Sequence, residues 1–136
     1  MKLFTIIAMF FISVSMKASI TFMEALVIIE SNQNCLAIGD NRKAFGCLQI
    51  HQSVITDVNC IYDCNYHVND AMYYEKSIEI CVKYLHHYGK VYRNKTGKKP
   101  NYEIFARIWN GGPNGYTKKS TEKYWKRVEL VLETNK

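Results

Sequence analysis

Five stretches of this sequence carry apolar residues at the three- and four-residue spacing of an α-helix, and three of them follow a residue suited to cap a helix. Thr21 followed by Glu24 is a capping-box pattern, and it predicts a first helix that ends near Ser31 and Asn32. A second, short helix is expected over residues 50–59.

The remaining three helices lie in the second half of the chain. Asn69 is suited to cap a long third helix that Gly89 would end. Asn101 predicts the start of a fourth helix, which the Gly-Gly-Pro run 111–113 would stop. A last helix is expected to start at residue 120 or 121.

Two segments break this helical pattern. Residues 37–46 contain glycines and the Gly39-Asp40-Asn41 run, which are typical of turns, and they predict a small hairpin or loop. Residues 90–100 read KVYRNKTGKKP and predict a solvated basic loop. Two domains in a chain of 136 residues would each have fewer than about 70 residues, and domains of that size rarely fold without disulfides or bound metals. The chain length therefore favours one core. We therefore predict a single α+β domain that is mostly α-helical.

Residues 1–18 have the layout of a secretory signal peptide. Lys2 precedes an apolar stretch, residues 3–15, and small residues follow near Ala18 and Ser19. The stretch is shorter than the roughly twenty residues that span a bilayer, which disfavours a membrane anchor. We expect cleavage to leave residues 19–136 as a secreted or periplasmic domain with no stable membrane insertion.

All five cysteines lie in the expected mature domain and can form disulfides in an exported chain. Because five is odd, at least one thiol stays unpaired or pairs between chains, and the sequence selects no arrangement. Cys60, Cys64, His67 and Cys81 include the ligand types of a zinc site, but their spacing matches no usual zinc motif. We therefore predict no metal and no cofactor.

The net charge of +6 favours anionic partners. The basic run 90–100 has little interleaved aromatic character beyond Tyr92, so we predict no nucleic-acid partner.

Glu30 is the residue whose setting most suggests chemistry. It follows the apolar run 25–29 at the end of the first expected helix. Apolar neighbours and the negative end of a helix both raise the pKa of a carboxyl group. A carboxyl that keeps its proton near neutral pH can act as a general acid, whereas the alternative is an ordinary exposed glutamate in the last helical turn.

Three segments together resemble motifs of the lysozyme-like superfamily. Residues 28–32, IIESN, resemble the Glu-Ser motif that ends the catalytic helix of soluble lytic transglycosylases and goose-type lysozymes. Residues 45–50, FGCLQI, and 106–113, ARIWNGGP, are similar to their Gly-Leu-x-Gln and Ala-Tyr-Asn-x-Gly segments. Residues 106–128, with Gly46-x-x-Gln49, also resemble invertebrate-type lysozymes. The resemblance covers about Thr21 to Val128 and implies a lysozyme-like catalytic domain.

The resemblance implies cleavage of the β-1,4 bond between N-acetylmuramic acid and N-acetylglucosamine in peptidoglycan glycan strands. Glu30 would be the general acid, and Ser31 would help to orient Glu30 or the muramyl group of the substrate. Gln49 would bond sugar substituents, and Asn110 would face the sugar from the cleft wall. Trp109 stands where the transglycosylase pattern has tyrosine. It would stack on a sugar or pack in the core, and Tyr116 or Tyr124 would replace the missing hydroxyl.

Asp40 bears on the reaction type. Invertebrate-type lysozymes have an aspartate in a comparable place, so the resemblance implies a second carboxylate and hydrolysis. Turn chemistry is the alternative explanation for Asp40. With Glu30 alone, the sugar's own hydroxyl would close on the anomeric carbon, as in lytic transglycosylases. Three other hypotheses remain: an inactive wall-binding module on the same fold, an enzyme that acts on chitin, and a secreted interaction protein held together by disulfides. We expect the protein to be a monomer.

Overall fold

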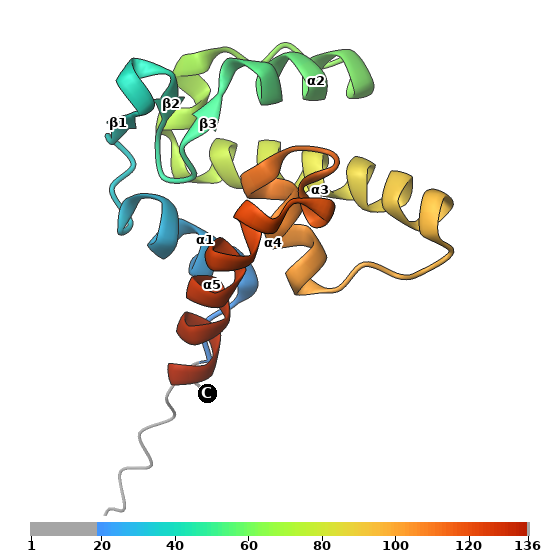
Figure 1. Cartoon of the computed structure of the whole chain (residues 1–136). Coiled ribbons are helices and arrows are strands. Elements are labelled where there is room, and N and C mark those ends of the chain that lie inside the picture. Colours follow the sequence, from blue (N-terminus) through green and yellow to red (C-terminus); the bar gives the residue numbers. More distant parts are fainter. Residues whose placement is uncertain (1–18, 136) are drawn as a thin grey trace, which may run out of the picture.

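The computed structural model describes residues 19–135, and within them it contains five α-helices and a small three-stranded antiparallel sheet (Figure 1). The predicted signal segment, residues 1–18, lies outside them. The expected α+β, mostly helical class is confirmed. The elements are α1 Phe22–Ser31, β1 Ile38–Gly39, β2 Ala44–Phe45, β3 Ile50–His51, α2 Gln52–Tyr62, α3 Tyr74–Thr96, α4 Tyr102–Gly111 and α5 Glu122–Thr134.

Helix α1 begins and ends as its sequence predicts. The Glu24 backbone N–H donates to Thr21 Oγ1 at 3.2 Å, and the Thr21 backbone N–H donates to Glu24 Oε2 at 2.7 Å. Both bonds satisfy amide groups that a helix start leaves without partners. Asn32 ends the helix in the left-handed conformation, with φ of 50°. This ending places Glu30 in the last turn of α1.

Helix α4 also follows its sequence signals. The Asn101 side chain accepts a hydrogen bond from the Ile104 backbone N–H at 3.0 Å, and the helix ends at Gly111. Helix α5 begins at Glu122, one or two residues after the predicted start at 120 or 121, and a 3-10 turn over Lys119–Thr121 precedes it.

The predicted bounds of the long helix were wrong at both ends. Asn69 lies in a 3-10 turn, Val68–Met72, and α3 begins only at Tyr74. Gly89 does not end α3, because it is buried where the Phe105 ring of α4 approaches the helix closely. Close packing between helices here outweighs the low helix propensity of glycine.

The basic segment 90–100 is therefore not a loop over most of its length. Residues 90–96 form the last turns of α3, and Tyr92 is buried on them. Gly97, with φ of 70°, supplies the left-handed residue that ends the helix.

The sheet occupies the predicted hairpin region and extends beyond it. Strand β2 pairs with β1 and β3, with Ile38 opposite Phe45 and Ala44 opposite His51. Ile50 belongs to β3 and not to a helix, so the second predicted helix began too early. Its side chain is fully buried while that of His51 is only partly covered, which is the alternation expected of a strand.

Helix α3 runs across the middle of the molecule, between the region of the sheet and α2 on one side and the region of α1 and α5 on the other (Figure 1). The core includes fully buried side chains from both sides, among them Leu26, Leu48, Ile55, Ile80 and Ile108. Within residues 19–135, no helix is long and apolar enough to cross a membrane.

One disulfide, between Cys35 and Cys47, joins the end of the α1 region to the turn before β3. Cys60, Cys64 and Cys81 are free thiols, and Cys81 is completely buried. Among the described residues, no group of three or more histidine, cysteine or acidic side chains is placed to hold a metal ion.

Candidate active site

A polar cleft of about 270 Å³ lies where the end of α1 faces the sheet and the end of α4. Its lining residues come from helices, strands and turns along the chain and are Glu30, Asp40, Ala44, Gln49, His51, Val54, Trp109 and Asn110. Five of the seven site residues expected from the sequence are in this set.

Glu30 projects from the last turn of α1 and is partly buried. Burial raises the pKa of its carboxyl group. Hydrogen bonding from Tyr124 and Trp109 and the positive charge of Arg127 oppose that increase, but burial outweighs them. The carboxyl group therefore holds its proton to a higher pH than an exposed glutamate, as a general acid requires.

Helix α5 supplies the groups that fix Glu30. Tyr124 Oη donates a hydrogen bond to Glu30 Oε1 at 2.6 Å. Burial and the Glu30 charge both raise the pKa of Tyr124 far above its usual value, so this hydroxyl remains a donor. Three residues further along α5, Arg127 Nη2 donates to the Ile29 carbonyl at 3.5 Å. The arginine thus adds positive charge at the negative end of α1.

Asp40 faces the same cleft from an unusual backbone. Asp40, Asn41 and Arg42 all have positive φ, at 47°, 52° and 67°. This conformation costs most residues with a side chain roughly 1–2 kcal/mol, and Asp and Asn adopt it more readily than Arg does. Asp40 Oδ2 lies 3.4 Å from His51 Nε2, so the aspartate is paired across the sheet as well as placed in a turn.

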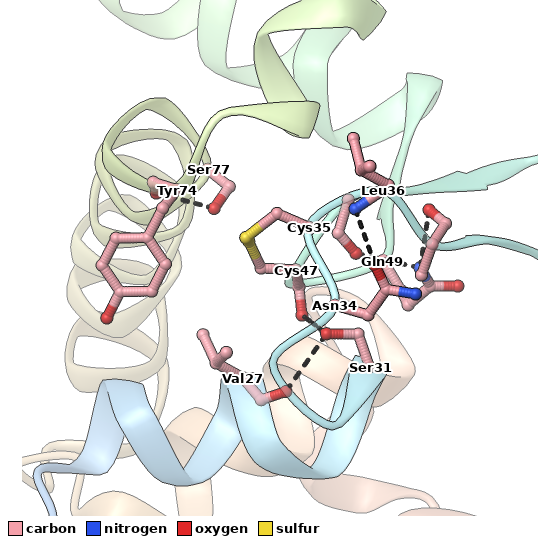
Figure 2. The surroundings of a disulfide bond; sticks show 11 residues. Val27, Ser31, Asn34, Cys35, Leu36, Cys47, Gln49, Tyr74 and Ser77 are labelled. Carbon is pink, nitrogen blue, oxygen red and sulfur yellow. Dashed lines mark hydrogen bonds between the residues drawn. A yellow bond between two sulfur atoms is a disulfide. The ribbon is translucent and has the colours of Figure 1, made fainter.

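Ser31 does not line the cleft. Its hydroxyl donates to the Cys47 carbonyl at 2.8 Å and lies 3.4 Å from the Val27 carbonyl. Figure 2 shows this hydroxyl directed at the backbone of the disulfide-bonded Cys47. The observed contacts of Ser31 attach the end of α1 to the segment that leads into β3.

Gln49 lines the cleft, but its amide nitrogen is used within the protein. Nε2 donates to the Gly46 carbonyl at 2.9 Å and to the Ala37 carbonyl at 3.3 Å. The residue has φ of 50°, which completes the turn between β2 and β3. The side chain therefore holds the Gly46-x-x-Gln49 turn against the segment before β1.

Trp109 and Asn110, at the end of α4, also line the cleft. The Trp109 ring also packs edge-on against Tyr84, with ring centres 5.8 Å apart, so it serves the core and the cleft together. Tyr116 is not among the cleft residues, and its ring packs edge-on against Tyr92 at 4.8 Å. Of the two tyrosines considered as replacements for the missing hydroxyl, Tyr124 is the one that contacts Glu30.

Sequence reasoning did not identify His51 as a site residue. The sequence pattern that could have identified His51 is the two-residue alternation of a strand. This alternation puts Gln49 and His51 on one side and Ile50 on the other. The apolar spacing from residue 50 onward was assigned to a helix instead, so the alternation was not recognised.

No family model matches this chain. Over 48 residues, which are 35% of each chain, it is 44% identical to "Lysozyme" of Ostrea edulis. Over 38 residues, it is 47% identical to "Lysozyme 1" of Crassostrea virginica, which covers 28% of this chain and 21% of that protein. The matched segments span about a third and a fifth of these two curated relatives. This local identity supports a lysozyme-like relation.

Proposed function

We propose that residues 19–136 form a secreted muramidase that cleaves peptidoglycan glycan strands with Glu30 as the general acid. The observation that carries the proposal is the placement of a partly buried carboxyl group with a raised pKa on a polar cleft, held there by Tyr124. The local identity to two lysozymes supports the same activity.

In this mechanism Glu30 gives its proton to the glycosidic oxygen as the bond to the anomeric carbon breaks. The carboxylate that remains keeps the hydrogen bond from Tyr124 and the nearby charge of Arg127, which stabilise its negative charge. Burial thus retains the proton before the reaction, and the donors lower the cost of releasing it.

Asp40 is proposed as the second carboxylate, on the sheet side of the cleft. As an anion it would stabilise positive charge at the anomeric carbon, attack that carbon, or activate a water molecule. When Asp40 attacks, water must then displace it from the anomeric carbon; when Asp40 activates water, that water attacks the carbon directly. Both of these routes end in hydrolysis and a reducing end. Without Asp40, attack by the muramyl hydroxyl would give an anhydro end.

Mass spectrometry of fragments released from purified peptidoglycan tests the proposal. Reducing ends that disappear in both Glu30→Gln and Asp40→Asn would support a two-carboxylate muramidase. Anhydro ends that are insensitive to Asp40→Asn would assign lytic transglycosylation.

The matched controls are Glu133→Gln and Asp63→Asn, because both residues are exposed and outside the cleft. Asp63 also has positive φ, at 52°, so its substitution copies the backbone setting of Asp40. Full activity in a folded Glu30→Gln variant would overturn the assignment of Glu30. Absence of fragments from the unaltered protein, with binding retained, would favour a wall-binding module.

A further inference from the structure

A second hollow of about 400 Å³ adjoins the cleft, and His51 lines both. The lining residues of this basic hollow are Arg42, Lys43, Phe45, His51, Gln52, Ser53 and Val68. Three of them are basic or protonatable, and none is acidic. His51 is the residue that the two spaces share, and its Nε2 lies 3.4 Å from Asp40 Oδ2, which belongs to the cleft.

The positive charges of the basic hollow are available to a ligand. Arg42 and Lys43 are both exposed, and within residues 19–135 neither forms an ion pair or a side-chain hydrogen bond. Arg107 is the contrasting case, because its guanidinium is already paired with Glu103 at 2.9 Å.

The backbone of the 3-10 turn Asp40–Arg42 links the two spaces. Its three consecutive left-handed residues place the first side chain on the cleft and the third on the basic hollow. Backbone conformations of this cost are typical of functional sites, where the surrounding structure holds them.

We propose that the basic hollow is a subsite for a carboxylate of the substrate, next to the position where the glycan is cut. The proposal rests on the muramidase function proposed above and extends it to substrate choice. Peptidoglycan carries carboxylates, on its peptide arms or on the lactyl group of muramic acid once an arm is removed. Chitin carries none, so the subsite would favour peptidoglycan over chitin.

Binding to the Glu30→Gln protein tests the subsite, because that variant is expected not to cut its ligand. Three ligands are compared: glycan oligomers with peptide arms, the same oligomers after an amidase has removed the arms, and chitin oligomers. Arg42→Gln with Lys43→Gln is the test variant. Lys98→Gln with Lys99→Gln is the control, because it removes the same charge from an adjacent exposed pair beyond α3.

We expect the test variant to weaken binding of a carboxylate-bearing ligand about three- to tenfold, the effect of two partly exposed charged contacts. Chitin binding and the control variant should be unchanged, and the difference should shrink at high salt. If the test variant loses affinity only for oligomers that carry peptide arms, the bound group is a peptide carboxylate. If it loses affinity only for amidase-treated oligomers, the bound group is the lactyl carboxylate.

Equal affinity of the test and control variants for every ligand would overturn the subsite. The same conclusion would follow if the test variant lost chitin binding by the same factor. The binding assay does not depend on cleavage, so failure of the proposed function would appear separately, as absence of fragments from the unaltered protein.

Discussion

The hydroxyl of Tyr124 donates to Glu30 Oε1 at 2.6 Å, although the two residues are 94 positions apart in the chain. One end of the bond is the last turn of α1 and the other is the first turns of α5. Packing between these helices therefore sets the orientation of the candidate acid. Tyr124 is a positioning residue in the proposed mechanism, and removal of its hydroxyl should change the titration of Glu30.

We expect Tyr124→Phe to lower kcat about 10- to 100-fold, since a hydrogen bond to a charged group contributes about 1.5–3 kcal/mol. The lost bond favours the ionised carboxyl, so its removal should raise the pKa of Glu30 further. The basic limb of the pH–activity profile should therefore move to higher pH. The profile of muramidase activity from about pH 4 to pH 9 measures this shift.

Tyr116→Phe is the matched control for that experiment, because it removes a hydroxyl from a tyrosine outside the cleft. It also tests the prediction that Tyr116 binds substrate, which would appear as a higher KM with an unchanged pH profile. A profile that stays in place in Tyr124→Phe would contradict the positioning role of Tyr124.

Glu30→Gln should change stability in a pH-dependent way. The pKa of Glu30 is higher in the folded chain than in the unfolded chain, so the folded state binds more protons between the two values. The free energy of unfolding of the unaltered protein therefore falls as the pH rises through that interval. Glutamine carries no charge to bury, so the variant should gain relative stability with rising pH, by about 1.4 kcal/mol for each unit of pKa difference.

Thermal unfolding of both proteins at about pH 4 and pH 8 measures this effect. The two proteins should be closest at the acidic end, where the carboxyl is largely protonated in both states. Glu133→Gln, at an exposed position, should show no such divergence. A constant difference between Glu30→Gln and the unaltered protein at both pH values would argue against a raised pKa.

The Cys35–Cys47 disulfide closes the segment that carries Asp40 into the cleft. Substitution of both cysteines by serine should lower the free energy of unfolding by about 3 kcal/mol, the loop-closure effect for a separation of 12 residues. Activity should also fall, because the turn that positions Asp40 loses its covalent anchor.

Urea unfolding measures the change in stability, and fragment release from peptidoglycan measures the change in activity. Cys60→Ser, at an exposed free thiol, is the control, and equal stability of the two variants would refute the prediction.

Local signals in the sequence predicted the parts of the fold that depend on local contacts. The bonds of Thr21 with Glu24, and of Asn101 with Ile104, span three residues, and both helix starts were correct. Gly89 led to a wrong prediction of the end of α3. Glycine stands there because a side chain would collide with the Phe105 ring of α4, and not because the helix ends. A single sequence does not show which glycines end helices and which admit neighbours.

The candidate site was predictable to a similar extent. Glu30 stands at a helix end after an apolar run, so its unusual carboxyl could be inferred from neighbours in the chain. The pairing of His51 with Asp40 depends on strand register, which the helical pattern around Ile50 does not indicate. Ser31 was expected to orient the acid or the sugar, and its hydroxyl donates to the Cys47 carbonyl. That contact joins residues 16 positions apart, so neighbours in the chain do not indicate it.

Gly46 begins the turn that Gln49 completes, and the structure explains why glycine stands there. Its φ is 75°, and a Cβ atom at this position would overlap the backbone carbonyl of Ala71. Gly97 has a similar φ of 70°, but a Cβ atom there would meet nothing within 4 Å, which makes it a matched control. Gly97→Ala should cost roughly 1–2 kcal/mol, the cost of a left-handed alanine.

Gly46→Ala should cost at least about 3 kcal/mol, because the backbone of Ala71 must move in addition to that conformational cost. The displacement would also separate Gln49 Nε2 from the Gly46 carbonyl and so loosen the sheet side of the cleft. Urea unfolding of the two alanine variants measures the difference. A similar loss of unfolding free energy in both variants would mean that the backbone around Gly46 moves to accept a side chain at little cost. The contact with Ala71 would then not explain why glycine stands in the Gly46-x-x-Gln49 turn.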